Sequence, residues 1–595
     1  MNPPPVLSPE TQGSGVEQAS GSGTHPVRRG LLLAGLSLLL FLCAFGVRLA
    51  YLTRVESTPF RDERRMITDA RYYDMRAREI AGGDLLGDAP GFLSPVYCYA
   101  LGGAYALAGE SMHVGKMLQV LLGAFSCVLL YWIGLKAFSG GIGLLAGFIL
   151  AFYGLHIYYT GLLLPTVLVV FLNLLALFFL LPSRRPAAWR FLLGGLVLGL
   201  AIGAKPNALL FLPFLGLWIL LAFRDASLRR RFLWGLLLLA GTAASIAPVT
   251  LRNYLVSGEF VLVTTTGGRN LLKGNGEGAD GSHVFLPGED QGTKLGLYIK
   301  HKVDNLEAVR EGREMTAQAL SVMLGDPLQT LGLFARKFFL FFNSIELGIR
   351  DQYYFTKTRF SFLRLPWVGF GLLAPFGIAG LILSWRRRNR AGLIRGLLGV
   401  QAASFVLVFV LARYRLVAVA CLALFASWTL FEVAALIRRR RWGRSGGTLL
   451  LVAGAAVFVN WPAPGFTTTR GWGDQYEFLA SIAFDADNLS KAEELYSKAL
   501  EYEFINPVYR QKPWFAEGRL AVCQLQQGKK DAARETTKGL IRKIDAYLEG
   551  VEADIAKGIS PGLETPVIMA REARKEMKHL LARINAYSPP EPKKQ

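Results

Sequence analysis

The stretch from Leu31 to Val47 reads LLLAGLSLLLFLCAFGV and contains no charged residue. A hydrocarbon core about 30 Å thick needs roughly 20 apolar residues in one helix, so this stretch and its flanks predict a membrane span. The pair Arg28-Arg29 precedes it as in a signal peptide, but no small-residue cleavage motif follows. We therefore expect an uncleaved first transmembrane helix.

The same length requirement is met, or nearly met, by about eleven apolar segments along the chain. They cover residues 31–51, 114–137, 141–159, 162–182, 190–204, 207–223, 232–250, 365–385, 393–412, 416–437 and 447–461. Pro206 weakens the boundary between the fifth and sixth segments, because it interrupts one apolar run. The pattern predicts an all-α polytopic membrane protein with about eleven transmembrane helices.

The composition supports this fold class. Hydrophobic residues make up 52% of the 595 residues and charged residues only 18%, which gives more apolar surface than a water-soluble core can bury. An ordinary cytosolic enzyme and a disordered scaffold are excluded, and five cysteines are too few for a disulfide framework. The net charge of +22 would suggest nucleic acid, but the basic residues cluster at the ends of apolar segments, so we expect no nucleic-acid partner.

The basic clusters also give the orientation, because cytoplasmic loops carry an excess of Lys and Arg. Successive crossings place on one side the clusters at residues 28–29, 136, 184–190, 224–231, 386–390 and 438–441. We assign that side to the cytoplasm, together with a disordered tail at residues 1–27. A transmembrane domain at 28–462 then has its long loops, 52–113 and 251–364, on the opposite face.

Residues 466–595 change to a charged, amphipathic and largely helical sequence. Residues 490–501 match the second helix of a tetratricopeptide unit, and 516–540 predict another helix pair that turns at Gly528. The offset between the two units is longer than the usual repeat of about 34 residues, so the repeat is irregular. We expect an extracytoplasmic helical domain that docks a protein partner or braces the membrane part, with a plain helical bundle as the alternative.

The first outer loop carries the best candidate for catalysis. Between Ile67 and Asp84 apolar residues recur at helical spacing, Thr68 is a competent N-cap, and Gly82 helps to stop the helix. Asp69 then occupies the first helical position, where free N–H groups and the helix dipole favour an ionised carboxylate. Such a group beside a membrane can act as a general base, although acidic residues are also common in first helical turns.

Three basic residues are exceptions to the orientation rule. Lys205, Arg413 and Arg415 fall at the outer ends of spans, where basic residues are disfavoured. A phosphate at the outer surface would explain them, because Arg binds phosphate through two donors and Lys supplies a point charge. The alternative for each residue taken singly is snorkelling to the outer headgroups.

Two other outer features belong to the candidate site. Residues 264–281 are rich in glycine but lack the Walker spacing, so they predict a flexible loop over a substrate. Glu346 follows an amphipathic stretch and could bring a second carboxylate to the same cavity, or be an ordinary helix-end charge. The six histidines are scattered and no H-E-x-x-H, paired-cysteine or D-x-D spacing occurs near Asp69, so the sequence indicates no metal site and no certain cofactor.

Several short motifs, taken in order, resemble one known family. They are residues 69–84, 93–97 and 116–119 near the start, and residues 204–207, 252–254, 266–270, 274–275 and 413–415 further along. Together they resemble the polyprenol-phosphate-dependent glycosyltransferases of the GT-C fold, which include bacterial relatives of protein O-mannosyltransferases and of lipid A aminoarabinose transferases. The resemblance covers roughly residues 30–460 and leaves the C-terminal region outside it.

The resemblance implies an inverting transfer of a sugar from a polyprenyl-phosphate carrier to a protein, lipid or glycan acceptor, at the outer face of a bacterial inner membrane. Asp69 corresponds to the catalytic base of the family. Ala70 stands where the family often has Glu, so no adjacent second carboxylate is implied, and Glu346 is the other catalytic candidate. The remaining assignments are contacts to the lipid phosphate, Lys205, Arg269, Arg413 and Arg415, and loop contacts to substrate, Tyr72, Tyr73 and Asn270.

A transporter or flippase of a lipid-linked glycan is the alternative function, because the same cations would bind its phosphate. Transporters tend to show internal repeats and polar residues near mid-membrane. The two halves of this sequence show no repeat, and the polar residues concentrate in the outer loops. A scaffold that acts only through C-terminal repeats would not need the outer acid and cations. The sequence therefore favours the glycosyltransferase.

Overall fold

The computed structural model describes residues 26–56, 69–182, 186–284, 305–349, 352–385, 388–505, 513–556 and 564–587. These residues form helices joined by turns, and the only β-type pairing among them is an isolated bridge between Tyr153 and Val368. The all-α fold class is therefore confirmed. The predicted tail at residues 1–27 lies almost wholly outside the described residues, and so does the predicted N-cap Thr68.

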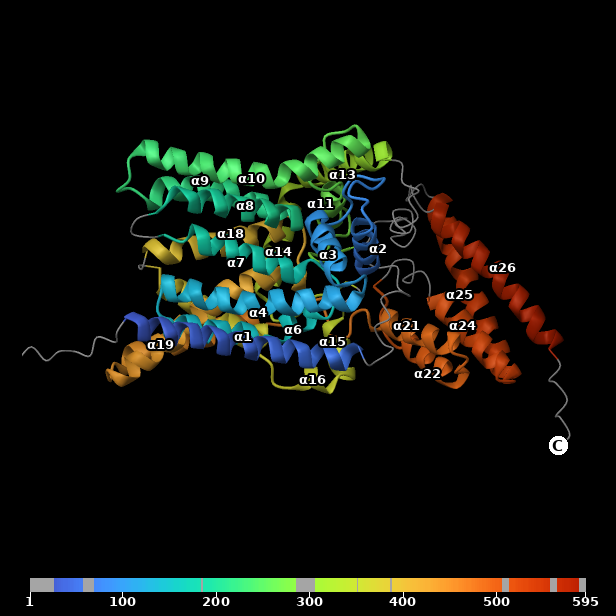
Figure 1. Cartoon of the computed structure of the whole chain (residues 1–595). Helices are drawn as coiled ribbons and strands as arrows, with labels where there is room; N and C mark the ends of the chain where they lie inside the picture. The colour runs from blue at the N-terminus through green and yellow to red at the C-terminus, as the bar shows by residue number, and fades with distance from the viewer. Residues whose placement is uncertain are drawn as a thin grey trace, which may run out of the picture.

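Within the described residues, five helices are long and apolar enough to cross a membrane. They are α1 (Pro26–Glu56), α4 (Met112–Ala137), α10 (Leu228–Ser257), α19 (Leu416–Arg438) and α20 (Trp442–Val459). Shorter apolar helices accompany them: α5 (Gly140–Ala151), α7 (Thr166–Leu180), α8 (Ala188–Ala204), α9 (Phe211–Ala222), α17 (Phe370–Leu383) and α18 (Arg388–Leu407). Figure 1 shows α1, α4, α8 and α10 running along one direction of the bundle. The chain is a multi-pass membrane protein.

One predicted span is divided into two helices. The sequence predicts a single span at residues 141–159, but α5 ends at Ala151 and a separate helix, α6 (Gly154–Thr160), follows. Between them the N–H of Val368 donates to the carbonyl of Phe152 at 3.0 Å, and the N–H of Gly154 donates to the carbonyl of Val368 at 3.1 Å. This pairing with a distant segment replaces helical hydrogen bonds, and apolar periodicity alone does not reveal it.

A buried arginine caps this break. Arg48 lies in α1 and donates to the carbonyls of Leu150 and Ala151, at 3.3 Å each, where α5 ends. Its guanidinium also lies 2.8 Å from Nδ1 of His156 in α6. The last carbonyls of a helix need donors where water is excluded. Arg48 therefore has a structural reason to lie inside an apolar span.

The helices of the two long loops lie toward one end of the bundle (Figure 1). They are α2 (Asp69–Ala81) and α3 (Pro95–Ala108) from the first loop, and α11 (Gly267–Asn275), α13 (Asn305–Gly325), α14 (Pro327–Phe342), α15 (Tyr353–Arg359) and α16 (Ser361–Arg364) from the second. The helix α2 begins at Asp69, as the sequence predicts. Figure 1 shows α2 and α3 running across the direction of the long helices. The helix α3, with Pro95 at its first position, is not among the predicted elements.

Asn253 ties the two loops together. Its buried side chain, near the end of α10, accepts from the N–H of Gly91 at 2.9 Å and donates to the carbonyls of Val261 and Val263 at 3.1 and 3.0 Å. The carbonyl of Gly91 accepts in turn from the N–H of Thr265 at 2.9 Å. Gly91 permits this approach, because a Cβ there would lie 2.6 Å from the carbonyl oxygen of Val263. The first loop is thereby fixed against the segment that follows α10.

The C-terminal region forms a row of helices beyond the end of the bundle that carries α2 and α3 (Figure 1). The helices are α21 (Trp472–Asp485), α22 (Leu489–Leu500), α24 (Pro513–Gln526), α25 (Lys530–Ala556) and α26 (Glu564–Ala586), and each packs against the next. Gly528 turns the chain between α24 and α25 with a φ of +77°, a left-handed conformation that favours glycine. The predicted helix pair at 516–540 is present, and the tetratricopeptide assignment stays a prediction.

Candidate functional site

A carboxylate of the first loop and an arginine far along the chain meet at the end of the bundle. Asp69 is the first residue of α2, and Arg413 lies in the 3-10 turn η3 (Ala412–Arg415) between α18 and α19. Arg413 Nη2 lies 3.7 Å from Asp69 Oδ2. The Asp69 side chain keeps 40% of its surface exposed and the Arg413 side chain keeps 14%. The two groups are close enough to attract each other; Arg413 is largely buried, and the Asp69 carboxylate is partly exposed.

Lys205 joins this site from a third element. It follows α8 with an extended backbone, because the next residue is Pro206, which disfavours a helical conformation before it. Its Nζ lies 3.7 Å from the ring centroid of Tyr414, and Cζ of Arg413 lies 5.3 Å from the same centroid. Aromatic faces attract cations in this way. The arrangement gathers two cations and one carboxylate at one place.

The helices α2, α3 and α8 hold Asp69 in place relative to Lys205. The hydroxyl of Tyr73, one turn after Asp69, accepts a hydrogen bond from the N–H of Ser94 at 3.3 Å. The Ser94 hydroxyl donates to the carbonyl of Gly203 at 3.5 Å, near the end of α8. Burial, and next the charge of Asp69, raise the pKa of the Tyr73 phenol well above its usual range. Tyr73 therefore stays protonated and positions the site.

The other acidic residues of α2 have tighter partners. Asp74 accepts a hydrogen bond from the hydroxyl of Tyr105 at 2.7 Å and another, at 3.0 Å, from an arginine one turn further on. Glu79 forms an ion pair of 2.6 Å with Arg76. Among the acidic residues of α2, Asp69 is therefore the most exposed and the most loosely held.

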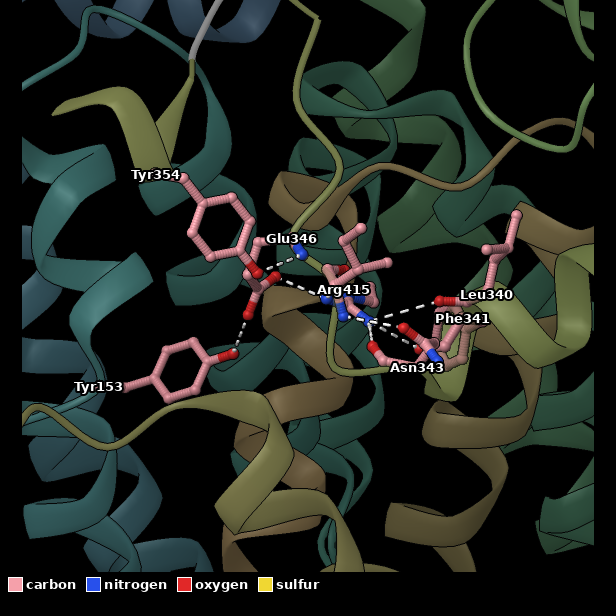
Figure 2. Close-up of polar contacts among 8 residues, drawn as sticks. Tyr153, Leu340, Phe341, Asn343, Glu346, Tyr354 and Arg415 are labelled. Carbon is pink, nitrogen blue, oxygen red and sulfur yellow. Dashed lines mark hydrogen bonds and ion pairs between the residues drawn. The ribbon is translucent and has the colours of Figure 1, made fainter. Parts of the chain in front are cut away.

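Arg415 lies only two residues after Arg413 but has a different environment, shown in Figure 2. Its guanidinium is buried and forms an ion pair of 2.5 Å with Glu346. Its terminal nitrogens also donate to the main-chain carbonyls of Leu340, Phe341, Asn343 and Ile345. The other oxygen of Glu346 accepts from the Tyr153 hydroxyl at 3.2 Å, and the N–H of Glu346 donates to the Tyr354 hydroxyl at 3.0 Å. Protein groups surround both charged groups, and of the Arg415 nitrogens Nε lacks a hydrogen-bond partner.

The predicted site is thus divided into two parts. Asp69, Arg413 and Lys205 share one open place, whereas Glu346 and Arg415 form a buried pair. The structure places both side chains in a buried pair, so the expectation that Glu346 acts beside Asp69 and that Arg415 contacts phosphate stays a prediction. A guanidinium that already donates to a carboxylate and to several carbonyls has few donors left for a ligand.

Three other predicted residues lie in the two long loops with partners of their own. Arg269 in α11 forms an ion pair of 2.7 Å with Glu311 in α13 and is largely buried. Asn270 follows it, and its N–H closes the first turn of α11. Tyr72 is buried, and its ring centroid lies 6.1 Å from that of Phe92. These contacts account for the positions of the three residues in the fold.

Sequence reasoning missed Tyr414. It stands between two arginines that the orientation rule singles out, and an aromatic residue beside such cations is a usable signal of a cation–π contact.

For metals, the residues that the structure describes contain no group of three His, Cys, Asp or Glu side chains that could hold an ion.

Part of this chain resembles known proteins. Residues 88–250 match the family model described as dolichyl-phosphate-mannose-protein mannosyltransferase. The chain is similar to the oligosaccharyltransferase of Archaeoglobus fulgidus in the apo form, with 14% identity, a TM-score of 0.42 and coverage of 77% of this chain and 59% of that chain. It is also similar to ArnT from Cupriavidus metallidurans bound to undecaprenyl phosphate, with 12% identity, a TM-score of 0.41 and coverage of 94% and 78%. No curated protein matches the chain.

The family match confirms the expected resemblance for residues 88–250, which run from the first loop to α10. It supports the class of membrane glycosyltransferases. Lys205 lies inside the matched segment, whereas Asp69 and Arg413 lie outside it. The chain spans 59% of the length of the archaeal oligosaccharyltransferase that it resembles.

Proposed function

We propose that this protein is a membrane glycosyltransferase that moves a sugar from a polyprenyl-phosphate carrier to an acceptor hydroxyl. The observation that carries the proposal is the open pair of Asp69 and Arg413, 3.7 Å apart, with Lys205 on the face of Tyr414 beside it. The description of the matched family, dolichyl-phosphate-mannose-protein mannosyltransferase, supports a sugar donor carried on a lipid phosphate. A base and a set of cations are the groups that such a transfer needs.

In the proposed reaction Asp69 is the general base. It takes the proton of the acceptor hydroxyl while the hydroxyl oxygen attacks the anomeric carbon of the sugar. The bond from that carbon to the phosphate oxygen breaks on the opposite side, so the configuration inverts. The electron pair of the broken bond stays on the lipid phosphate, which leaves with an additional negative charge.

The two cations stabilise the departing lipid phosphate, because charge-assisted hydrogen bonds strengthen as negative charge develops. In the structure Arg413 lies beside Asp69. A bound phosphate takes the place of Asp69 as the partner of Arg413.

The other predicted residues receive supporting roles in this proposal. Glu346 and Arg415 form a buried ion pair, and this pair holds the turn η3 in place. Arg269 and its neighbour Asn270 remain candidates for substrate contact from α11. Arg269 would then exchange Glu311 for the donor.

We further propose a cytoplasmic N-terminus, with the transmembrane domain at 28–462 and the C-terminal domain at 466–595 on the extracytoplasmic side of a bacterial inner membrane. Basic clusters at the ends of the spans support this orientation. Single cysteines introduced at exposed positions of residues 480–580 should react with an impermeant reagent added from outside. Reaction only from the cytoplasmic side would overturn the orientation.

The function is tested by incubating purified protein with a panel of polyprenyl-phosphate sugars and candidate acceptors. Mass spectrometry should detect free polyprenyl phosphate together with a glycosylated acceptor. The Asp69→Asn variant is the control, because it keeps the size of the side chain but cannot take a proton. Movement of intact donor across vesicles without cleavage would contradict the glycosyltransferase and favour the flippase.

A further inference from the structure

The segment of residues 408–411, which joins α18 to η3, sets the position of Arg413. It is not helical, and the rest of the protein holds it through its main chain. The side chain of Asn275 donates to the carbonyl of Leu407 at 2.9 Å, just before the segment. The N–H of Val410 donates to the carbonyl of Gly281 at 3.1 Å, and the N–H of Ala412 donates to the carbonyl of Leu347 at 2.8 Å. The outer loops thus fix where the proposed phosphate-binding turn begins.

Gly281 can accept from Val410 only while its own loop keeps its shape. Gly281 has a φ of +93°, which an L-residue adopts only with strain. The preceding residue, Asp280, stabilises the turn with Oδ1, which accepts from the N–H of Ser282 at 2.8 Å and from its hydroxyl at 2.7 Å. Its other oxygen, Oδ2, points to a cation from another part of the chain.

That cation is Arg470, which lies between α20 and α21, beyond the last apolar helix. Arg470 Nη2 lies 2.9 Å from Asp280 Oδ2, and Nη1 donates to the Ser282 hydroxyl at 3.3 Å. The guanidinium packs on the ring of Phe466, 4.8 Å from its centroid. Both members of the pair are largely buried. Burial raises the pKa of Asp280, but the hydrogen bonds from Ser282 and the charge of Arg470 outweigh it, so the pKa falls below its usual value.

We infer that Arg470 is a positioning residue for the cations of the proposed donor site. It fixes Asp280, Asp280 shapes the turn at Gly281, and the carbonyl of Gly281 holds Val410, three residues before Arg413. The inference rests on the proposed function for its consequence, because Arg413 matters to catalysis only if it binds donor phosphate. The chain beyond the last span then completes the site instead of serving only to dock partners.

The inference is tested in the full-length protein with Arg470→Ala and Arg470→Lys. The matched control is Arg571→Ala, which removes another ion pair of the C-terminal region, 2.8 Å long with Glu552, far along the chain from this turn. Hydrogen exchange of a peptide covering residues 408–415 reports the link directly. Steady-state transfer with varied donor and varied acceptor reports its effect on the reaction.

Arg470→Ala should speed exchange in the 408–415 peptide and raise the donor KM roughly three- to thirtyfold, the range expected when coupling through a hydrogen-bonded network is lost. The acceptor KM should stay within about twofold, since Arg470 acts through the phosphate-binding turn. Arg470→Lys should restore part of the donor KM because it keeps the charge. Arg571→Ala should change neither measurement.

Unchanged exchange in Arg470→Ala would overturn the inference, and so would faster exchange with an unchanged donor KM. An inactive wild-type protein would contradict the proposed function instead. In that case the exchange of the 408–415 peptide would still decide whether Arg470 holds the turn, because exchange does not depend on transfer.

Discussion

Two arginines of one short turn, Arg413 and Arg415, each face a carboxylate from another part of the chain, and the two pairs differ in distance and exposure. Arg413 faces Asp69 across 3.7 Å with exposed fractions of 14% and 40%, whereas Arg415 contacts Glu346 at 2.5 Å with exposed fractions of 2% and 7%. The first pair is loose and reaches solvent. The second is closed, and main-chain carbonyls and a tyrosine hydroxyl surround it. Only the open pair can exchange its partner for a substrate.

The difference also predicts how each pair contributes to stability. The Asp69–Arg413 pair is 3.7 Å apart and its carboxylate is partly exposed, so water and salt screen it and it stabilises the fold less than a closed, buried pair does. Removing one member of a buried pair costs about 3 to 5 kcal/mol, because the other charge stays buried without a partner. Variants of Asp69 should therefore affect the reaction, and variants of Glu346 should affect the fold.

The largest expected effect belongs to Asp69→Asn. The variant keeps the size and helix-start geometry of the residue but cannot accept a proton, so transfer should slow by about 10² to 10⁴. Donor binding and melting temperature should stay near wild type. The matched control is Asp74→Asn in the same helix, whose carboxylate already has an arginine and Tyr105 as partners. Wild-type transfer by Asp69→Asn would make Asp69 only a helix-start residue.

Glu346→Ala should lower the free energy of unfolding by about 3 to 5 kcal/mol, since it strands the buried charge of Arg415. Thermal unfolding of the purified protein in detergent measures this loss. Glu346→Gln should be milder, because an amide oxygen can still accept from Arg415. A Glu346→Ala protein that melts like wild type but no longer transfers sugar would reverse the roles of the two pairs.

Lys205→Ala and Arg413→Ala should weaken donor binding while the fold stays intact. Each removes a charge-assisted contact worth about 1.5 to 3 kcal/mol, which corresponds to roughly a ten- to hundredfold rise in donor Kd. Lys136→Ala serves as the control, because Lys136 also stacks on an aromatic ring, 3.3 Å from the centroid of Phe178, but belongs to a cluster predicted on the cytoplasmic side. Equal donor affinity in all three variants would leave only a snorkelling role for Lys205 and Arg413.

A third carboxylate, Glu477 in α21, is buried without a basic partner close enough to offset the effect of burial on its pKa. Its substitution should have the smallest effect of those considered. Burial raises its pKa to about 7, although the Ser481 hydroxyl donates to it at 3.1 Å. Because the folded-state pKa lies above the unfolded value, the neutral form stabilises the fold at low pH, and this contribution is lost as the pH rises through about 7. Glu477→Gln should therefore gain on the order of 1 kcal/mol over wild type between pH 5 and pH 8. Parallel pH dependences of the two melting temperatures would refute this.

The sequence predicts the all-α membrane fold, because a lipid environment imposes long apolar helices on any chain that crosses it, whereas the count of eleven spans stays a prediction. It also predicts α2 with Asp69 at its start, since capping and helical spacing are local properties. The break at Tyr153 and the helix α3 escape prediction. The first depends on pairing with Val368, and the second lies in a loop that Asn253 fixes from far along the chain.

The sequence predicted part of the grouping of the candidate residues, and their roles stay predictions. The orientation rule singles out Lys205, Arg413 and Arg415 as cations in unusual places, and the structure gives Lys205 and Arg413 a common neighbour in Tyr414. The orientation rule does not distinguish Arg413 from Arg415. The direction of Arg415 depends on Glu346 and on carbonyls some seventy residues earlier in the chain, which no local pattern contains.

We propose that the Asp69 carboxylate acts as a base in a single displacement on a lipid-phosphate sugar. The anomeric configuration of the first product, measured by NMR before any equilibration, is the most direct test. This mechanism predicts inversion relative to the donor, because Asp69 removes a proton and forms no bond to the sugar. Retention would require a covalent intermediate or an attack from the other face, and would contradict the role of Asp69 as the base.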